Sequence, residues 1–199
     1  ERGVATRMLG THADISERKF IEEQLKALAS RDFLTGLNNR RVFVERMEEE
    51  LARIKRYPDQ TPCALLMLDL DHFKRINDSF GHSAGDEVLI HFSELLKSTL
   101  RDIDVCGRLG GEEFGILLPN TPESPALELA NRLCAIVRES RLDIRGSMLS
   151  FTVSIGVTVL QSSDTSTEHA MMRADAALYR AKTGGRDRVF SDRLINVSS

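Results

Sequence analysis

Residues 105–118 read Val-Cys-Gly-Arg-Leu-Gly-Gly-Glu-Glu-Phe-Gly-Ile-Leu-Leu, two apolar runs joined by a glycine- and glutamate-rich turn. The runs predict two strands, and Gly110 with Gly111 predicts a tight hairpin, because the favoured two-residue turns need positive φ. Glu112 and Glu113 place two like charges side by side, which a bare turn rarely does because neighbouring carboxylates repel. Taken alone, the hairpin fits an exposed acidic turn as well as a metal or phosphate site.

Hydrophobic periodicity divides the rest of the chain into helices and strands around this hairpin. The expected elements are, in chain order, a helix over about 40–56, a strand over 63–68, a short helix over 73–80, a helix over about 84–100, the hairpin strands 105–109 and 114–118, a helix reaching about 139, a strand over 149–160, a helix over about 166–182 and a short strand near 189. Helices grouped against a mainly antiparallel sheet of about five strands predict an α+β fold of ferredoxin-like type.

Composition excludes several classes of protein. The 199 residues suffice for one full domain with flanking sequence, and a net charge of −3 gives no bulk attraction to nucleic acid or membranes. Three widely spaced cysteines without a Cys/His cluster indicate neither a disulfide framework nor a zinc site. The sequence contains no apolar run of membrane-spanning length and no signal peptide. Because the first residue is not Met, we expect a fragment of a longer protein.

The N-terminal part of the sequence predicts a short strand-like segment within 1–14 and then a helix. The apolar positions of this helix are Ile21, Leu25 and Leu28, spaced by four and three residues. Such a narrow apolar seam suits a connector that meets a partner helix, but it also suits a helix that packs on its own domain. The sequence leaves both interpretations open.

A second group of polar residues begins at Asp69, where the predicted strand 63–68 ends abruptly. A carboxylate there is costly unless it is paired or ligates a cation. If this strand neighbours the hairpin, Asp69 and Glu112 converge on one hard cation such as Mg²⁺, which prefers carboxylates and nucleotide phosphates. Lys74 and the backbone N–H groups of the next helix then hold phosphate oxygens. The alternative is a solvated strand end whose aspartates cap that helix.

Two further pairs of residues have both a functional and a structural interpretation. Asn77 and Asp86 offer donors and acceptors that match a guanine edge, although isolated residues of these types near helix starts are often caps. Lys182 and Arg186 bracket two glycines after the last helix, where basic residues and a glycine stop are expected in any case.

Six motifs in this order resemble the GGDEF family, diguanylate cyclases that join two GTP molecules into cyclic di-GMP, and the resemblance covers roughly residues 30–190. The motifs are Asp32-Phe-Leu-Thr-Gly-Leu-Asn-Asn-Arg-Arg41, Asp69-Leu-Asp-His-Phe-Lys-Arg-Ile-Asn-Asp78, Phe80-Gly-His-Ser-Ala-Gly-Asp86, Arg108-Leu-Gly-Gly-Glu-Glu-Phe114, Val153-Ser-Ile-Gly156 and Ala174-Asp-Ala-Ala-Leu-Tyr-Arg-Ala-Lys182. The resemblance implies the ferredoxin-like palm of nucleotidyl cyclases, preceded by a linker helix.

The resemblance also implies roles for individual residues. Asp69 and Glu112 are the implied metal ligands, with the Leu70 carbonyl contributing and Glu113 either ligating or assisting deprotonation. The implied metal is Mg²⁺, which Mn²⁺ can replace. Asn77 and Asp86 are the implied readers of guanine. The implied triphosphate contacts, through backbone and side chains, are His72, Phe73, Lys74, Lys182 and Arg186. His72 departs from the aromatic residue often found there, which a backbone contact tolerates.

A product-binding site is implied just upstream of the hairpin. Arg101 and Asp104 match the RxxD inhibition motif, with five residues between Asp104 and Gly110, and Arg132 falls where such domains often place another arginine that helps bind the product dimer. Without the resemblance, these residues describe a surface turn with salt bridges of little energetic weight.

The resemblance therefore predicts an enzyme that condenses two GTP into cyclic di-GMP and two pyrophosphates across a homodimer, with product inhibition. The alternative is a non-catalytic GTP or cyclic di-GMP receptor on the same fold, although degenerate members usually lose an acidic ligand and none is lost here. An RNA-binding module of this fold needs exposed aromatics and a basic field. The chain has nine Phe, two Tyr, no Trp and a negative net charge, which argues against that module and against nucleic-acid partners.

The expected domain organisation has four parts. Residues 1–15 resemble the end of a PAS sensor domain, 16–31 form a linker or signalling helix, 32–192 form the GGDEF domain, and 193–199 are a tail. The expected partners are GTP, cyclic di-GMP, a second copy of the chain and an upstream sensor domain. The expected location is the bacterial cytoplasm, with any membrane anchor of the full-length protein outside this sequence.

Overall fold

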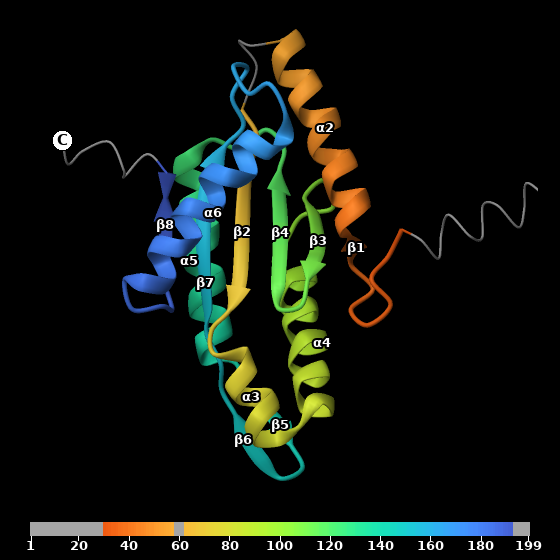
Figure 1. Cartoon of the computed structure of the whole chain (residues 1–199), viewed down its shortest axis with the longest axis vertical. Helices are drawn as coiled ribbons and strands as arrows, with labels where there is room; N and C mark the ends of the chain where they lie inside the picture. Colours follow the sequence, from red (N-terminus) through yellow and green to blue (C-terminus); the bar gives the residue numbers. More distant parts are fainter. Residues whose placement is uncertain (1–29, 58–61, 193–199) are drawn as a thin grey trace, which may run out of the picture.

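A six-stranded sheet in the order β1-β3-β4-β2-β7-β8 runs through the centre of the computed structural model, which describes residues 30–57 and 62–192 (Figure 1). The strands of this sheet are β1 (Asn38–Asn39), β2 (Ala64–Leu70), β3 (Val105–Gly110), β4 (Glu113–Leu118), β7 (Val153–Val159) and β8 (Val189–Ser191). A separate hairpin consists of β5 (Leu142–Ile144) and β6 (Ser147–Leu149). The helices are α2 (Arg40–Arg56), α3 (Phe73–Phe80), α4 (His82–Thr99), α5 (Glu123–Glu139) and α6 (Thr167–Thr183).

Strand β2 is the central strand and is buried along its whole length. It pairs antiparallel with β4 on one side and with β7 on the other, and β3 pairs antiparallel with β4. Only the short outer strands β1 and β8 pair in parallel. The prediction of a mainly antiparallel α+β sheet with a doubly buried first strand is thus confirmed.

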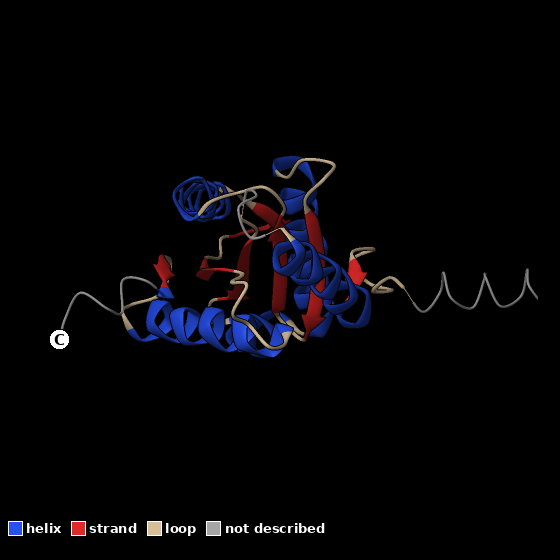
Figure 2. Cartoon of the chain, turned by 90° about the horizontal axis from the view of Figure 1, so that it is seen from above, coloured by secondary structure: helices blue, strands red, loops and turns tan. Residues whose placement is uncertain are grey.

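Helices cover both faces of the sheet, as the view from above shows (Figure 2). Leu65 and Met67 of β2 pack in one hydrophobic cluster with α2 and α6, whereas Leu66 and Leu68 pack in the other with α3, α4 and α5. This alternation follows the two-residue period of strand side chains. Each fully buried leucine contributes about 2 kcal/mol to stability. Two independent layers therefore hold β2, and with it the carboxylate at its end.

The helices begin and end within two residues of the predicted bounds, but parts of the strand prediction are wrong. The structure does not continue the expected strand 149–160 from end to end, because Leu149 ends β6 and β7 begins at Val153. Phe151 lies between them and is buried against the rings of His91 and Phe92, so its apolar character reflects loop packing. The sheet has six strands rather than about five, because Asn38–Asn39 adds to the edge of β3.

Parts of the expected domain organisation lie outside the described residues. The PAS-like segment 1–15, the predicted linker helix except for its last two residues, and the tail 193–199 belong to this group. Ser30 lies in a turn, and Arg31 forms an isolated bridge with Asn38. Within residues 30–57 and 62–192, none of the helices combines the length and the apolar character needed to cross a membrane.

Candidate active site

The β3–β4 turn lies beside the C-terminal end of β2. Asp69 pairs in register with Glu113, and the backbone N–H of Leu70 donates a hydrogen bond to the carbonyl of Glu112 over 3.3 Å. Because β2 and β4 are neighbours, the structure brings Asp69, Leu70, Glu112 and Glu113 to one end of the sheet. Their adjacency is the condition under which the sequence predicted a shared cation.

Two carboxylates at this end of the sheet, those of Asp69 and Glu112, have pKa values above their usual range. Burial raises the pKa of Asp69, and the ammonium of Lys182, 2.8 Å from Asp69 Oδ2, only partly offsets this. Burial also raises the pKa of Glu112, and the nearby Asp69 charge raises it further. Carboxylates whose ionised form is disfavoured by burial and by a neighbouring like charge are typical of functional sites, a cation site among them.

The donors at this site fit Mg²⁺. They are two side-chain carboxylates and the Leu70 carbonyl, all hard oxygens of the kind that Mg²⁺ prefers, and Mg²⁺ commonly takes few protein ligands beside substrate phosphates. Across the described ranges, no three His, Cys, Asp or Glu side chains form a ready cluster for a metal. A metal at this site would take its remaining ligands from substrate phosphates or water.

The hairpin turn differs from the prediction by one residue. Gly110 is the last residue of β3 and pairs with Glu113, so the two turn residues are Gly111 and Glu112. Of the two glycines only Gly111 has positive φ, at +46°. This places Glu112 in the turn itself and Glu113 on β4, where its side chain is exposed.

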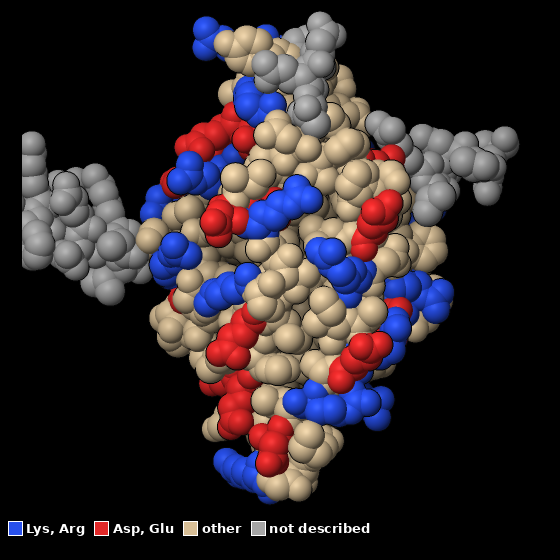
Figure 3. All heavy atoms as spheres, turned by 180° about the vertical axis from the view of Figure 1, so that it is seen from behind, with Lys and Arg blue, Asp and Glu red and all other residues tan. Residues whose placement is uncertain are grey.

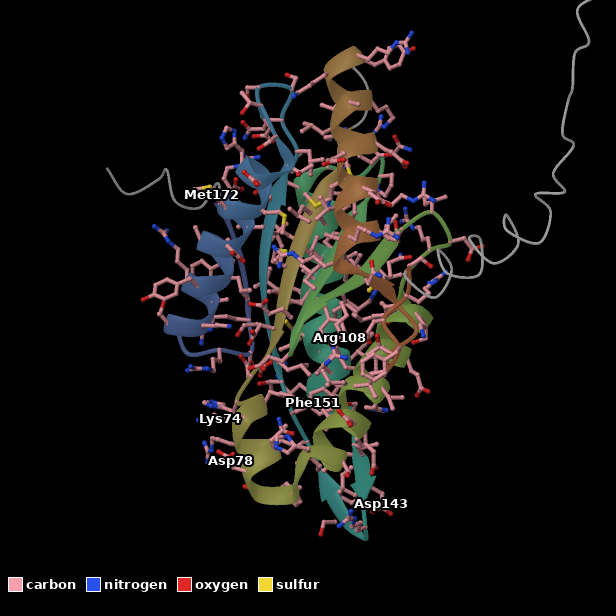
Figure 4. All side chains as sticks on the ribbon, turned by 45° about the vertical axis from the view of Figure 1, so that its right-hand side comes forward. Lys74, Asp78, Arg108, Asp143, Phe151 and Met172 are labelled. Atoms are coloured by element: carbon pink, nitrogen blue, oxygen red, sulfur yellow. The ribbon has the colours of Figure 1, made fainter. Side chains whose placement is uncertain are left out.

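Arg108 ties the turn to the start of the domain, a role that sequence reasoning missed. Its Nε and Nη2 donate to the Gly111 carbonyl over 2.9 and 2.8 Å, and Nη1 donates to Asp32 Oδ1 over 3.1 Å. Asp32 also accepts hydrogen bonds from the N–H and hydroxyl of Thr35. Figure 4 shows Arg108 at the lower end of β3. The only sequence signal was that Asp32 and Arg108 each open a motif.

The guanine candidates lie on two neighbouring helices, Asn77 on α3 and Asp86 on α4. Asn77 Oδ1 is buried and has no hydrogen-bond partner within the described residues, and the side chain of Asp86 is exposed. A Cβ atom on Gly85 would lie 2.0 Å from Asn77 Oδ1, so only glycine admits this position of the amide. An orphaned buried amide oxygen is costly and points to a ligand.

The phosphate candidates come from two places. His72 has a left-handed backbone with φ of 59° and precedes α3, whose first N–H groups have no partner within the helix. Phe73 is buried in the core, so only its backbone can meet a ligand, whereas Lys74 is exposed (Figure 4). Lys182 lies at the end of α6 against Asp69, and Arg186 follows in a left-handed turn with φ of 61°.

The three candidates for product binding line one hollow of about 140 Å³ between the start of β3 and α5. Arg101 is exposed, and its backbone N–H donates to Asp104 Oδ2 over 2.9 Å, so Asp104 also closes its own turn. Arg132 reaches the same hollow from α5. The structure thus brings together Arg101, Asp104 and Arg132, which are separated in the sequence.

A ferredoxin-like sheet with an acidic turn beside a helix N-terminus defines a domain of the nucleotidyl-cyclase palm class. The chain belongs, more narrowly, to the GGDEF family: residues 29–188 match the family described as diguanylate cyclase, GGDEF domain. This identification confirms the resemblance drawn from the six motifs.

Similar proteins extend the comparison. The chain is 45% identical over 168 residues to diguanylate cyclase DgcP of Pseudomonas aeruginosa, covering 84% of this chain and 24% of the relative. It is 44% identical over 182 residues to diguanylate cyclase DgcM of Escherichia coli, covering 89% of this chain and 42% of the relative. The chain therefore spans less than half the length of these relatives. Among solved structures, the coiled coil and GGDEF domain of DgcB from Caulobacter crescentus in complex with c-di-GMP has a TM-score of 0.83 at 30% identity, covering 89% of this chain and 93% of that chain.

Proposed function

We propose that this domain is a diguanylate cyclase that converts two GTP into cyclic di-GMP and two pyrophosphates. The observation that carries the proposal is the convergence of Asp69 and Glu112 at the end of β2, next to the N-terminus of α3. No acidic position of the motif is lost, and relatives that are 44–45% identical are named diguanylate cyclases.

Guanine recognition is assigned to Asn77 and Asp86. The Asn77 amide is assigned to guanine O6 or N3, to which its NH₂ group donates. The exposed carboxylate of Asp86 accepts from the N1–H and N2–H groups of the guanine edge. Adenine lacks this pattern of donors, so the pair favours GTP over ATP. A site built to hydrogen-bond one base rejects a base that leaves its polar groups unpaired.

The triphosphate is assigned to the start of α3 and the end of α6. The N–H groups of His72 and Phe73 and the ammonium of Lys74 face it from one side, and Lys182 with Arg186 faces it from the other. Helix N-termini and basic side chains both stabilise phosphate charge. Mg²⁺, or Mn²⁺ in its place, is held by Asp69, Glu112 and the Leu70 carbonyl and supplies Lewis-acid stabilisation of the phosphates.

The chemistry requires two copies of the domain, each holding one GTP. The 3′-oxygen of one nucleotide forms a bond to the α-phosphorus of the other, and the bond from that phosphorus to the β-phosphate bridging oxygen breaks, releasing pyrophosphate. Glu113, exposed on β4 beside Asp69, is assigned to take the proton of the 3′-hydroxyl. Repeating the step with the roles exchanged closes the ring. A homodimer supplies the proximity that one copy lacks.

Product inhibition is assigned to the hollow that Arg101, Asp104 and Arg132 line. Guanidinium groups suit the phosphates and guanine edges of cyclic di-GMP, and a related GGDEF structure is in complex with c-di-GMP. Arg101→Ala is expected to raise the concentration of cyclic di-GMP that halves the rate while turnover without product is kept. Unchanged product affinity in that variant contradicts the assignment.

Regulation is assigned to an upstream sensor domain, and the place of action to the bacterial cytoplasm, where GTP is available. Nucleic acid is not among the proposed partners. In agreement with this, Figure 3 shows acidic and basic side chains mixed over the rear face rather than one field of positive charge.

The direct test is to incubate the purified chain with GTP and Mg²⁺ and to quantify cyclic di-GMP. We expect product from the wild type, none after removal of the metal with EDTA, and at least a hundredfold loss in Glu112→Gln, as is usual when a charge that stabilises the transition state is removed. GTP binding without product from a confirmed dimer, with Glu112→Gln indistinguishable from wild type, would instead support the non-catalytic receptor. Equal turnover of ATP would contradict the role of Asp86.

A further inference from the structure

We infer that Asp71 is a positioning residue that joins the two halves of the triphosphate site, and this inference rests on the proposed function. Asp71 lies just after β2 and is only 4% exposed. Its carboxylate accepts three hydrogen bonds: from Thr152 Oγ1 over 2.7 Å, from Ser154 Oγ over 2.7 Å and from the backbone N–H of Asp187 over 2.9 Å. Its own N–H donates to the Thr152 carbonyl over 2.9 Å.

These contacts distinguish the environment of Asp71 from that of the neighbouring acidic residues Asp69 and Glu112. The carboxylate of Asp69 faces the ammonium of Lys182 at 2.8 Å, and Glu112 lies in the hairpin turn. Asp71 is as deeply buried as Asp69 but faces three neutral donors, which use most of the acceptor capacity of a carboxylate. We therefore infer that the Asp71 carboxylate positions the backbone of Asp187 and does not bind a cation.

The backbone that Asp71 holds is in a conformation that needs support. Arg186 and Asp187 are consecutive left-handed residues, with φ of 61° and 49°, and neither is glycine. Such residues persist only where surrounding contacts over-determine them. The Asp187 N–H bonds to Asp71, and the Asp187 carboxylate bonds to Arg138 of α5, with Arg138 Nη2 at 3.0 Å. These two anchors hold the Asp187 side of the turn that carries Arg186, whose own N–H donates to the Ala181 carbonyl over 2.9 Å.

Asp71 also adjoins the other half of the site. The residue after it is His72, whose left-handed φ of 59° leads into α3 and its free N–H groups. One residue thus precedes the phosphate loop at 72–74 directly and bonds to the turn at 184–187, although Asp71 and Asp187 are 116 positions apart. Loss of the carboxylate is expected to release Arg186 from the phosphates and to leave the guanine contacts of Asn77 intact.

The test compares binding of two probes, guanosine and a guanosine triphosphate whose α,β-bridging oxygen is replaced by CH₂ so that no pyrophosphate can leave. In Asp71→Ala, we expect affinity for the triphosphate to fall by about tenfold and affinity for guanosine to stay at the wild-type value, since one hydrogen bond to a charged group has roughly this weight. Asp71→Asn is expected to restore triphosphate binding, because its amide oxygen can still accept from Asp187 while its NH₂ donates to Ser154.

Two control variants separate positioning from general stability. Asp164→Ala removes an equally buried carboxylate, 3% exposed, that bonds to Arg173 and lies outside the phosphate contacts. Ser154→Ala removes a donor to Asp71 Oδ1 but leaves the Asp187 bond to Oδ2. Both should lower the melting temperature without changing the ratio of the two affinities. A ratio that falls equally in either control would overturn the inference.

Further outcomes distinguish this inference from the proposed function. If the wild type binds guanosine and the triphosphate analogue equally well, the proposed function and the role of Asp71 are both contradicted. If the wild type prefers the triphosphate and Asp71→Ala shows the same preference, only the role of Asp71 is contradicted. If Asp71→Ala does not fold, Arg138→Gln gives a second test, because it frees the Asp187 carboxylate from the other side. That variant should also lose triphosphate affinity selectively, and full retention would count against the inference.

Discussion

Gly85 occupies a position where any side chain would strike the residue assigned to guanine. Its hypothetical Cβ lies 2.0 Å from Asn77 Oδ1 and 3.1 Å from Phe73 Cζ. Gly85 is helical, in α4, so its backbone conformation alone would allow alanine. The glycine is therefore explained by the close approach of the amide.

Gly85→Ala is expected to displace the Asn77 amide and to raise the KM for GTP by about tenfold, the weight of one hydrogen bond to the base, while GTP loses part of its advantage over ATP. Steady-state kinetics with both nucleotides measures this. Glu87→Ala, at an exposed site on the same helix, is the matched control and should change neither value. In Asn77→Ala the added Gly85→Ala change should have little further effect, and full additivity would contradict the steric explanation.

A second prediction at the scale of single residues concerns Arg108. Its guanidinium bridges the Gly111 carbonyl and Asp32, and burial of the pair leaves the two side chains only 13% and 17% exposed. Arg108→Lys keeps the charge but loses the forked geometry. We expect cyclase activity to fall by about tenfold through misplacement of Glu112 by a fraction of an ångström, with the domain still folded.

Cyclic di-GMP formation and thermal unfolding, measured on the same Arg108→Lys preparation, check this expectation. Asp32→Asn should give a similar loss, and the double variant should lose little more because both changes break the same contact. Independent, multiplying losses would mean that Arg108 and Asp32 act separately.

At the residue scale, the sequence predicts contacts made by chain neighbours or adjacent strands and fails for distant partners. Asp69 and Glu112 could be placed together because a strand beside a hairpin brings their ends into contact. The Arg108–Asp32 and Asp71–Asp187 pairs are 76 and 116 positions apart, and no periodicity links such residues. Their partners are set by the way the whole sheet closes.

Among the secondary-structure elements, those long enough to show a hydrophobic period could be predicted, and the shortest strands could not. Helices α2 and α3 have the predicted bounds because apolar residues recur at helical spacing in each of them between clear stops. Strands β1, β5 and β6 have two or three residues each, too few for a period to show. In the hydrophobic run 149–160, the sequence pattern cannot distinguish a loop that buries Phe151 from a continuous strand.

The loop before α6 is held by an ion pair whose titration can be predicted. Arg173 donates to both oxygens of Asp164, over 2.6 and 3.0 Å, and the Gln161 N–H adds a third bond. Burial alone would raise the pKa of Asp164, but these hydrogen bonds outweigh it, and the pKa lies below its usual value of 3.8. The ionised form is thus stabilised by folding.

Because the folded-state pKa of Asp164 is lowered, its contribution to stability is complete above about pH 4 and is lost as the pH falls through the folded-state value. Asp164→Ala should lower the free energy of unfolding at pH 7 by about 2 kcal/mol, because Arg173 loses its hydrogen bonds to this carboxylate but keeps Asp192 at 3.1 Å. The difference in unfolding free energy between variant and wild type should narrow as the pH falls below about 4. Urea unfolding across this range measures the gap, and a gap independent of pH would show that Asp164 is not the titrating group.

On the scale of the whole molecule, the active site and the proposed product site lie at opposite ends of β3. Arg101 precedes the strand and the Gly111–Glu112 turn follows it, so a strand of six residues, roughly 20 Å at the usual rise, separates them. Cyclic di-GMP held at Arg101 therefore cannot touch Glu112 of the same domain. The proposed product inhibition is therefore expected to act without direct contact between the bound product and Glu112 of the same domain.

The need for two copies leads to a prediction about concentration. If each copy holds one GTP and the bond forms between copies, the rate at protein concentrations below the dimer dissociation constant depends on the square of the concentration, and halving the protein lowers the rate by about fourfold. Cyclic di-GMP formation over a dilution series at saturating GTP, with the mass in solution measured in parallel, checks this. Glu112→Gln mixed in excess with wild type should suppress activity, because mixed pairs lack one functional site. A rate proportional to concentration through the range where the mass falls to that of a monomer would mean that a single copy completes both steps.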